Sequence, residues 1–230
     1  MDGKDILLER MEAEEAPPVS KANYVLGRLR RDMADGTLQP GAALHQADIA
    51  RRYGVSVTPV REALRLLEAE GRINRSPHRS ATVLDLLPTD IKDLYLLRAE
   101  VEGFTAQLAA ERCTPEGLTA IQQFQSELEE KSSNTHAVDL SALNRRFHFA
   151  IAAMGSELIA SHVLDPLWER FTPPSTSIWA DPTAITCFLD EHRAIIGAIR
   201  DGDAVTARQR MATHVMTAER LRQQLAGAQD

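Results

Sequence analysis

The feature that most constrains this chain is a short apolar stripe that directly follows a glycine stop. After Gly54, the apolar residues of the segment 55–70 recur at intervals of three and four. They are Val60, Ala63, Leu64 and Leu67. This spacing predicts an amphipathic helix, and Pro59 suits its first turn, where amides have no helical partner. A second helix is expected over 46–53, ending at Gly54. The sequence therefore predicts two short helices joined by a tight turn.

The flanking segments extend this unit in both directions. Residues 23–33 have the pattern of a helix that stops at Gly36. Residues 72–86 are typical of a two-stranded wing with its tip at 77–80. We therefore expect a winged helix-turn-helix domain over residues 20–86.

The second helix carries a polar and cationic stripe beside its apolar one. Thr58, Arg61 and Arg65 share this face. An α-helix fits the major groove of DNA, and its N-terminal residues reach the base edges. Arg61 is expected to hydrogen-bond a guanine base. Ser56 or Thr58 is expected to cap the helix and to form hydrogen bonds with phosphates or bases. The alternative is a solvated face whose arginines pair with neighbouring glutamates. The predicted DNA-binding residues are Arg51, Ser56, Thr58, Arg61, Arg65, His78 and Arg79.

The charge distribution supports this interpretation only weakly. The net charge is −7, which by itself argues against a nucleic-acid partner. Basic residues nevertheless outnumber acidic ones within 20–85, whereas residues 1–19 and 86–230 carry an acidic excess. Such asymmetry is common in DNA-binding proteins, although chance clustering explains it equally well.

The remainder of the chain has a helical pattern throughout. We expect helices at about 88–112, 115–132, 137–153, 156–171, 184–201 and 203–226. The predicted fold is mainly α, with a flexible acidic arm at 1–19, the winged helix-turn-helix at 20–86, and an all-helical bundle at 87–230.

The composition indicates the cellular compartment. No run of 18 or more apolar residues occurs, and the acidic N-terminus resembles neither a secretory signal nor a transit peptide. Cys113 and Cys187 lack metal-type spacing, and a disulfide is not expected. The sequence therefore predicts a cytoplasmic protein without a membrane partner.

Three histidines stand out because each lies on the apolar stripe of a different predicted helix. They are His148, His192 and His214. Burying an imidazole without partners is costly, and three that converge would suit one divalent metal. Asn144, one turn before His148, would add an oxygen ligand. The alternative is that each histidine is simply hydrogen-bonded in the core.

Two segments of the sequence resemble a known protein family. Residues 38–41 and 47–71 closely resemble the GntR family of bacterial regulators, and the run Thr58-Pro59-Val60-Arg61-Glu62-Ala63-Leu64 is highly specific for it. The helical remainder resembles the FadR-type branch, which has an FCD effector domain. Two departures concern DNA contact, since the family often has arginine where Val57 stands and glycine where Ser80 stands.

The resemblance implies a metal and an effector. The FCD ligand positions match Asn144, His148, His192 and His214, with asparagine replacing the acidic residue. Three imidazoles suit zinc or nickel, and a neutral oxygen ligand implies weaker metal retention. The implied effector is a small organic acid held near Arg98. For Arg98, an ordinary ion pair with Glu102 is the alternative.

These expectations combine into one function and two alternatives. The first is a ligand-responsive repressor that binds palindromic operator DNA as a homodimer. The second is a metal-dependent hydrolase built on the three histidines. The third is a DNA-bound scaffold whose histidines are structural.

Overall fold

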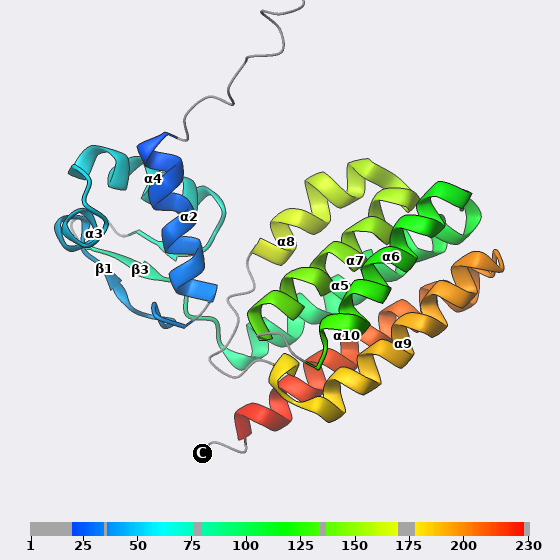
Figure 1. The fold of residues 1–230 in the computed structure, drawn as a ribbon. Coiled ribbons are helices and arrows are strands. Elements are labelled where there is room, and N and C mark those ends of the chain that lie inside the picture. Colours follow the sequence, from blue (N-terminus) through cyan, green and yellow to red (C-terminus); the bar gives the residue numbers. More distant parts are fainter. Residues whose placement is uncertain (1–19, 35, 76–79, 134–136, 170–177, 228–230) are drawn as a thin grey trace, which may run out of the picture.

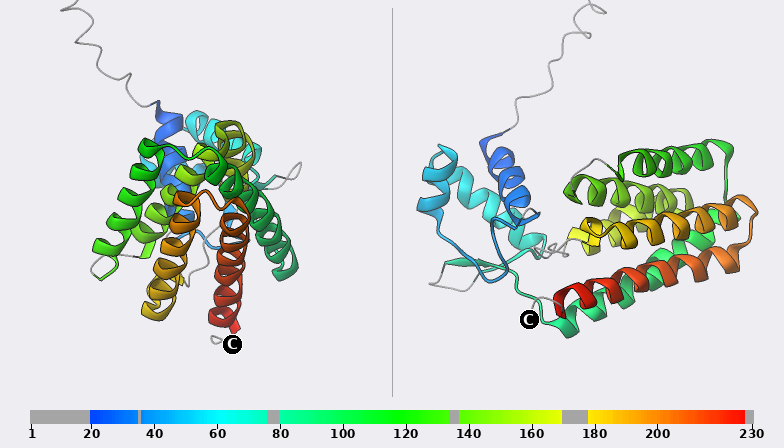
Figure 2. Two further views of the ribbon diagram at one scale, coloured as in Figure 1. Left: turned by 90° about the vertical axis from the view of Figure 1, so that its right-hand side faces the viewer. Right: turned by 60° about the horizontal axis from the view of Figure 1, so that its bottom comes forward.

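The chain folds into two parts, each with its own apolar core (Figure 1). The computed structural model describes residues 20–34, 36–75, 80–133, 137–169 and 178–227. Among these residues, the N-terminal part has three helices and a small sheet, and the C-terminal part is helical. Figure 2 shows the two parts side by side, with the long helices confined to the second. The predicted fold class is thus confirmed.

The N-terminal part is a helix-turn-helix that packs on one further helix. Its helices are α2 (Lys21–Ala34), α3 (Gln46–Tyr53) and α4 (Val57–Ala69). Gly54 closes α3 in the left-handed conformation, with φ of 66°, which favours glycine at this position. The whole predicted stripe of α4 is buried, with each side chain at most 1 % exposed. Ser56 occupies the N-cap position as expected, but its side chain makes no capping hydrogen bond.

The wing belongs to a three-stranded antiparallel sheet. The strands are β1 (Ala43–Leu44), β2 (Ile73–Asn74) and β3 (Ala81–Val83), in the order β1-β3-β2. Ile73 pairs with Val83, and both side chains are buried. The sequence analysis missed β1, because a two-residue strand is too short to show an alternating pattern. The wing tip, with His78 and Arg79, lies outside the described residues.

The C-terminal part is a bundle of long helices. Its main helices are α5 (Pro88–Glu111), α6 (Pro115–Lys131), α7 (Ala137–Ile159), α9 (Pro182–Arg200) and α10 (Ala204–Gly227). Helix α5 lies between α7 and α10 and packs on both. Prolines open α5, α6 and α9 in their first turns, where the missing amide costs nothing. The predicted helices agree with these to within about two residues at most ends.

The end of α7 departs from a simple helix. Ser156 is extended, with φ of −165° and ψ of 108°, close to the break expected between 153 and 156. A π-helical turn, Ala160–Leu164, then leads into the short helix α8 (Asp165–Glu169). A short 3-10 helix, η2 (Ile178–Ala180), precedes α9. Neither the π-helical turn nor η2 was predicted from the sequence.

Helices α5 and α7 come into backbone contact beside this break. A Cβ built on Gly155 would lie 2.2 Å from the carbonyl oxygen of Thr105 on α5. Only a residue without a side chain therefore permits this approach. Arg112 donates from Nη1 to the Gly155 carbonyl oxygen, which further joins the two helices.

One helical segment, Asp139–Trp168, would also pass for a membrane span by length and composition. A buried helix of a bundle passes the same test, and α7 packs against α5 and α6 here. The segment also contains the extended Ser156, whose backbone groups would lack partners in lipid. The packing of α7 thus accounts for its apolar composition.

Candidate functional site

The predicted DNA-reading face of α4 lies open to solvent. Ser56, Thr58, Arg61 and Arg65 are all exposed, and so is Val57 beside them. Within the described part of the chain, neither Arg61 nor Arg65 makes an ion pair. The face and the first turn of the helix are thus accessible to a duplex.

Other arginines of this domain already have acidic partners. Arg51 lies 3.3 Å from Asp48 and stays largely exposed. Arg52 pairs at 2.9 Å with Asp32, which is 4 % exposed and also accepts a hydrogen bond from the Tyr53 hydroxyl at 2.7 Å. Asp32 therefore fixes α2 against α3.

The three predicted histidines converge inside the helical bundle. His148 comes from α7, His192 from α9 and His214 from α10, and each is at most 3 % exposed. The Nε2 atom of His214 lies 3.2 Å from Nε2 of His192 and 3.2 Å from Nε2 of His148. The sequence analysis thus identified three side chains that the fold brings to one point.

Each imidazole is anchored at its other nitrogen by an oxygen. Nδ1 of His148 lies 2.5 Å from Oε2 of Glu102. Nδ1 of His192 lies 2.9 Å from Oε1 of Gln125, and Nδ1 of His214 lies 2.7 Å from Oε2 of Glu191. Because these oxygens are acceptors, each Nδ1 carries the proton when the ring is neutral. The three Nε2 lone pairs then face one another.

The surroundings favour neutral rings and charged carboxylates. Burial lowers the pKa of His148 against the opposing effect of Glu102. Burial, together with the other two histidines, holds the pKa of His192 well below its usual value. Burial alone would raise the pKa of Glu102, but Arg98 and His148 outweigh it and bring that pKa to about 2. A neutral imidazole is the form that binds a metal.

This donor set fits a divalent metal. The Nε2 lone pair of His214 lies 3.2 Å from Nε2 of each of the other two rings, and lone pairs this close repel one another unless a cation lies between them. Tetrahedral ligands with bonds of about 2.0–2.1 Å lie roughly 3.3 Å apart, close to the observed 3.2 Å. A second hydrogen bond on each ligating histidine is also usual at metal sites.

Asn144 supplies a further polar atom on the same helix as His148. It lies one turn before that histidine on α7. Its Oδ1 is buried, and among the described residues it has no hydrogen-bond partner. A buried carbonyl oxygen without a partner is costly, and a metal would satisfy it. Asn144 therefore remains a candidate oxygen ligand.

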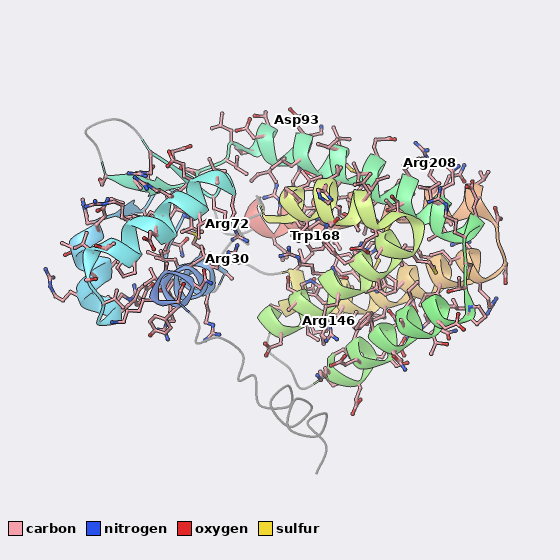
Figure 3. The ribbon with its side chains drawn as sticks, turned by 90° about the horizontal axis from the view of Figure 1, so that it is seen from above. Arg30, Arg72, Asp93, Arg146, Trp168 and Arg208 are labelled. Atoms are coloured by element: carbon pink, nitrogen blue, oxygen red, sulfur yellow. The ribbon has the colours of Figure 1, made fainter. Side chains whose placement is uncertain are left out.

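Arg98 lies beside the histidines, but it is held by Glu102. Its Nε donates to Oε1 of Glu102 at 2.7 Å, and Arg98 is 6 % exposed. Its guanidinium lies 3.9 Å from the centre of the Trp168 ring, whose Nε1 donates to the same Oε1 at 3.2 Å. Figure 3 shows Trp168 on the side of the bundle that is turned toward the winged domain. The ion pair considered as the alternative is thus present, and the effector role of Arg98 stays a prediction.

The residues that anchor the histidines were missed by sequence reasoning. Gln125 follows Ile121 by four positions and precedes Leu128 by three, so it is a polar residue on an apolar stripe. Glu102 interrupts an apolar stripe on α5 in the same way. The signal that identified the histidines would have identified both. The role of Glu191 could not be predicted from spacing, because its partner His214 lies on a different helix, α10.

Comparison with known proteins agrees with this architecture. Residues 21–83 match the model of bacterial regulatory proteins, gntR family, and residues 93–217 match the FCD domain. The HTH-type transcriptional regulator McbR of Escherichia coli K12 is 26 % identical over 187 residues, covering 80 % of this chain and 85 % of its own length. The HTH-type transcriptional repressor GlaR of the same organism is 26 % identical over 201 residues, covering 82 % and 90 %.

A solved structure extends the similarity to three dimensions. The structure of E. coli McbR/YncC superposes with a TM-score of 0.75 at 25 % identity, covering 90 % of this chain and 99 % of the other. A regulator from Rhodococcus sp. RHA1 has the same fold, with a TM-score of 0.68 at 24 % identity.

Proposed function

Because this chain belongs to the gntR family of bacterial regulatory proteins and carries an FCD domain, we propose that it is a repressor controlled by a small organic acid at a metal site. The family consists of transcription regulators that bind operator DNA, and it is not a family of enzymes. The metal, the acid and the repressor role are the proposal.

The observation that carries the metal proposal is the shared orientation of three rings. His148, His192 and His214 present Nε2 atoms to one point while an oxygen holds each Nδ1. Asn144 would complete the protein ligands. The bound metal, zinc or nickel, would supply a Lewis acid with positions left for an effector carboxylate.

The effector proposal follows from the charges around these rings. The ligand set is neutral, and Arg98 is matched by Glu102. Of the two carboxylates that hold histidines, only Glu191 is then left to offset the charge of a divalent metal, so an anionic effector is favoured. A carboxylate that approaches Arg98 must compete with Glu102, which makes the metal the primary anchor.

We further propose that the protein acts as a cytoplasmic homodimer on a palindromic site. Large apolar side chains are exposed on α5, at the end of α7 and on the π-helical turn that leads to α8, and they suit a contact with a second copy. They are Leu97, Phe104, Leu158 and Val163. Light scattering on the purified protein tests the dimer, and a monomer at micromolar concentration would contradict it.

The decisive experiment separates sensing from a structural role of the histidines. Protein purified without a histidine tag is analysed for metal, and its binding to operator fragments is measured with organic acids, with and without chelator. We expect about one metal per chain and an acid response that the chelator abolishes. Absence of metal, with an acid response insensitive to chelator, would favour the DNA-bound scaffold with structural histidines.

Thermal shift identifies the acid. A ligand at 100 times its dissociation constant stabilises the folded state by about 2.7 kcal/mol. Generic ester substrates test the hydrolase alternative, which no observation favours, since Glu102 and Glu191 both hold histidines.

A further inference from the structure

A chain of hydrogen bonds runs from the surface of the bundle to one histidine of the cluster. Arg193 donates from Nε to Oε1 of Glu129 at 2.9 Å. The same Oε1 lies 2.7 Å from Nε2 of Gln125. Oε1 of Gln125 lies 2.9 Å from Nδ1 of His192. Gln125 is 4 % exposed and His192 is fully buried, so the chain ends in the core.

The contacts of Gln125 determine which way its amide faces. One end of the amide meets two acceptors, the Glu129 carboxylate and the Leu189 carbonyl oxygen at 3.3 Å. Only an NH₂ group can satisfy two acceptors, so the carbonyl end must face His192. A flipped amide would place its oxygen against both acceptors and leave them without donors.

This orientation determines the protonation of His192. A carbonyl oxygen only accepts, so Nδ1 of His192 must donate and Nε2 must carry the lone pair. That lone pair lies 3.2 Å from Nε2 of His214. His148 and His214 are held by carboxylates instead. His192 is therefore the histidine whose tautomer depends on a neutral amide and its two acceptors.

We infer that Gln125 is a positioning residue, which, with Glu129 and the Leu189 carbonyl, keeps His192 in the tautomer that binds metal. The inference rests on the metal site of the proposed function. Gln125 does not touch the metal position itself. It acts through His192, as the outer partners of metal-binding histidines do.

The test compares two glutamines on one helix. Gln125→Met removes the amide with little change in length, and Gln123→Met makes the same substitution at an exposed position of α6. Zinc affinity of the untagged protein is measured by competition with a chromophoric chelator. Gln125→Met should bind zinc about 10- to 100-fold more weakly, the usual effect of losing an outer partner, and Gln123→Met should match the unmodified protein. Equal affinity in the two folded variants would overturn the inference.

A second measurement does not require bound metal. Nitrogen NMR of ¹⁵N-histidine-labelled, metal-free protein distinguishes ring tautomers. We expect His192 to be protonated at Nδ1 and to become a mixture of tautomers in Gln125→Met, with His148 and His214 unchanged. Protonation of His192 at Nε2 in the unmodified protein would refute the inference. If the unmodified protein binds no metal, the proposed function fails, whereas this spectrum still decides the role of Gln125.

A third variant covers the case in which Gln125→Met does not fold. Glu129 is only partly buried, and Arg193 would keep its contact with Asp190 at 2.5 Å. Glu129→Met therefore leaves the core intact while removing one of the two acceptors. We expect a smaller loss of zinc affinity in the same direction. Unchanged affinity, with Gln125→Met unfolded, would reject the positioning role.

Discussion

Replacing Gly155 by alanine should drive two core helices apart. The added Cβ would lie 2.2 Å from the Thr105 carbonyl oxygen and 3.1 Å from the Ala109 amide nitrogen. Ordinary contact needs about 3.5 Å, so α7 must move by roughly 1 Å. Because the opposing atoms belong to the backbone, no rotamer change can relieve the clash. We expect a loss of about 3 kcal/mol, at the upper end of the usual cost of overpacking.

Guanidinium unfolding followed by tryptophan fluorescence measures this loss. The only tryptophans of the chain are Trp168 and Trp179, so the signal reports on the helical bundle. With a typical denaturant dependence, the midpoint should fall by roughly 0.5 M. The control is Gly197→Ala, where the new Cβ meets nothing within 4 Å. That change should stabilise α9 by about 0.5–1 kcal/mol, since glycine is a poor helix former.

The same substitution should disturb the histidine cluster. His148 lies two turns before Gly155 on α7, and Glu102 lies on α5. Separating the helices lengthens the 2.5 Å contact between them, so metal retention should weaken together with stability. An unfolding midpoint at or above that of the unmodified protein would refute the reasoning, because it would mean that the helices tolerate a side chain at their contact.

Other substitutions test the remaining surfaces. Arg61→Ala should abolish specific operator binding without affecting the fold, while Arg200→Ala, an exposed arginine on α9, should not; an unchanged footprint with Arg61→Ala would contradict the recognition-helix assignment. His148→Ala should lose its metal on dialysis, and elemental analysis that finds full occupancy would argue against the site. Arg98→Met should lower the free energy of unfolding by about 3 kcal/mol, because it leaves the buried carboxylate of Glu102 without its cationic partner. Denaturant unfolding measures this loss, and an unchanged free energy of unfolding would show that the ion pair does not stabilise the bundle. Val57→Arg should shift the preferred operator toward guanine at one position per half-site. In vitro selection measures this preference, and identical motifs for the variant and the unmodified protein would show that residue 57 does not contact the bases.

Much of the fold was predictable because its helices carry strong local signals. Gly54 ended α3 and prolines opened α5, α6 and α9, so these boundaries follow from backbone chemistry alone. The break at Ser156 was expected only approximately. The π-helical turn after it depends on packing against neighbouring helices, and no spacing of residues in the sequence predicts it.

The candidate site divides in a similar way. The histidines were found because a polar ring on an apolar stripe is unusual. Their hydrogen-bond partners were not found, since a bond such as that between Glu191 and His214 joins residues on different helices, 23 positions apart in sequence. Arg98 illustrates the limit of local reasoning, because its spacing to Glu102 suited both a free guanidinium and an ion pair. Only the packed bundle shows that the pair forms.

The order of the small sheet has a mechanical consequence. β3 is its central strand, and only residues 84–87 separate β3 from the start of α5. Four residues span at most about 14 Å, so a tilt of α5 pulls on the middle of the sheet, where both neighbours resist. The winged domain would then rotate as a rigid unit. In the proposed dimer, the spacing between the two winged domains on DNA would therefore depend on the position of α5.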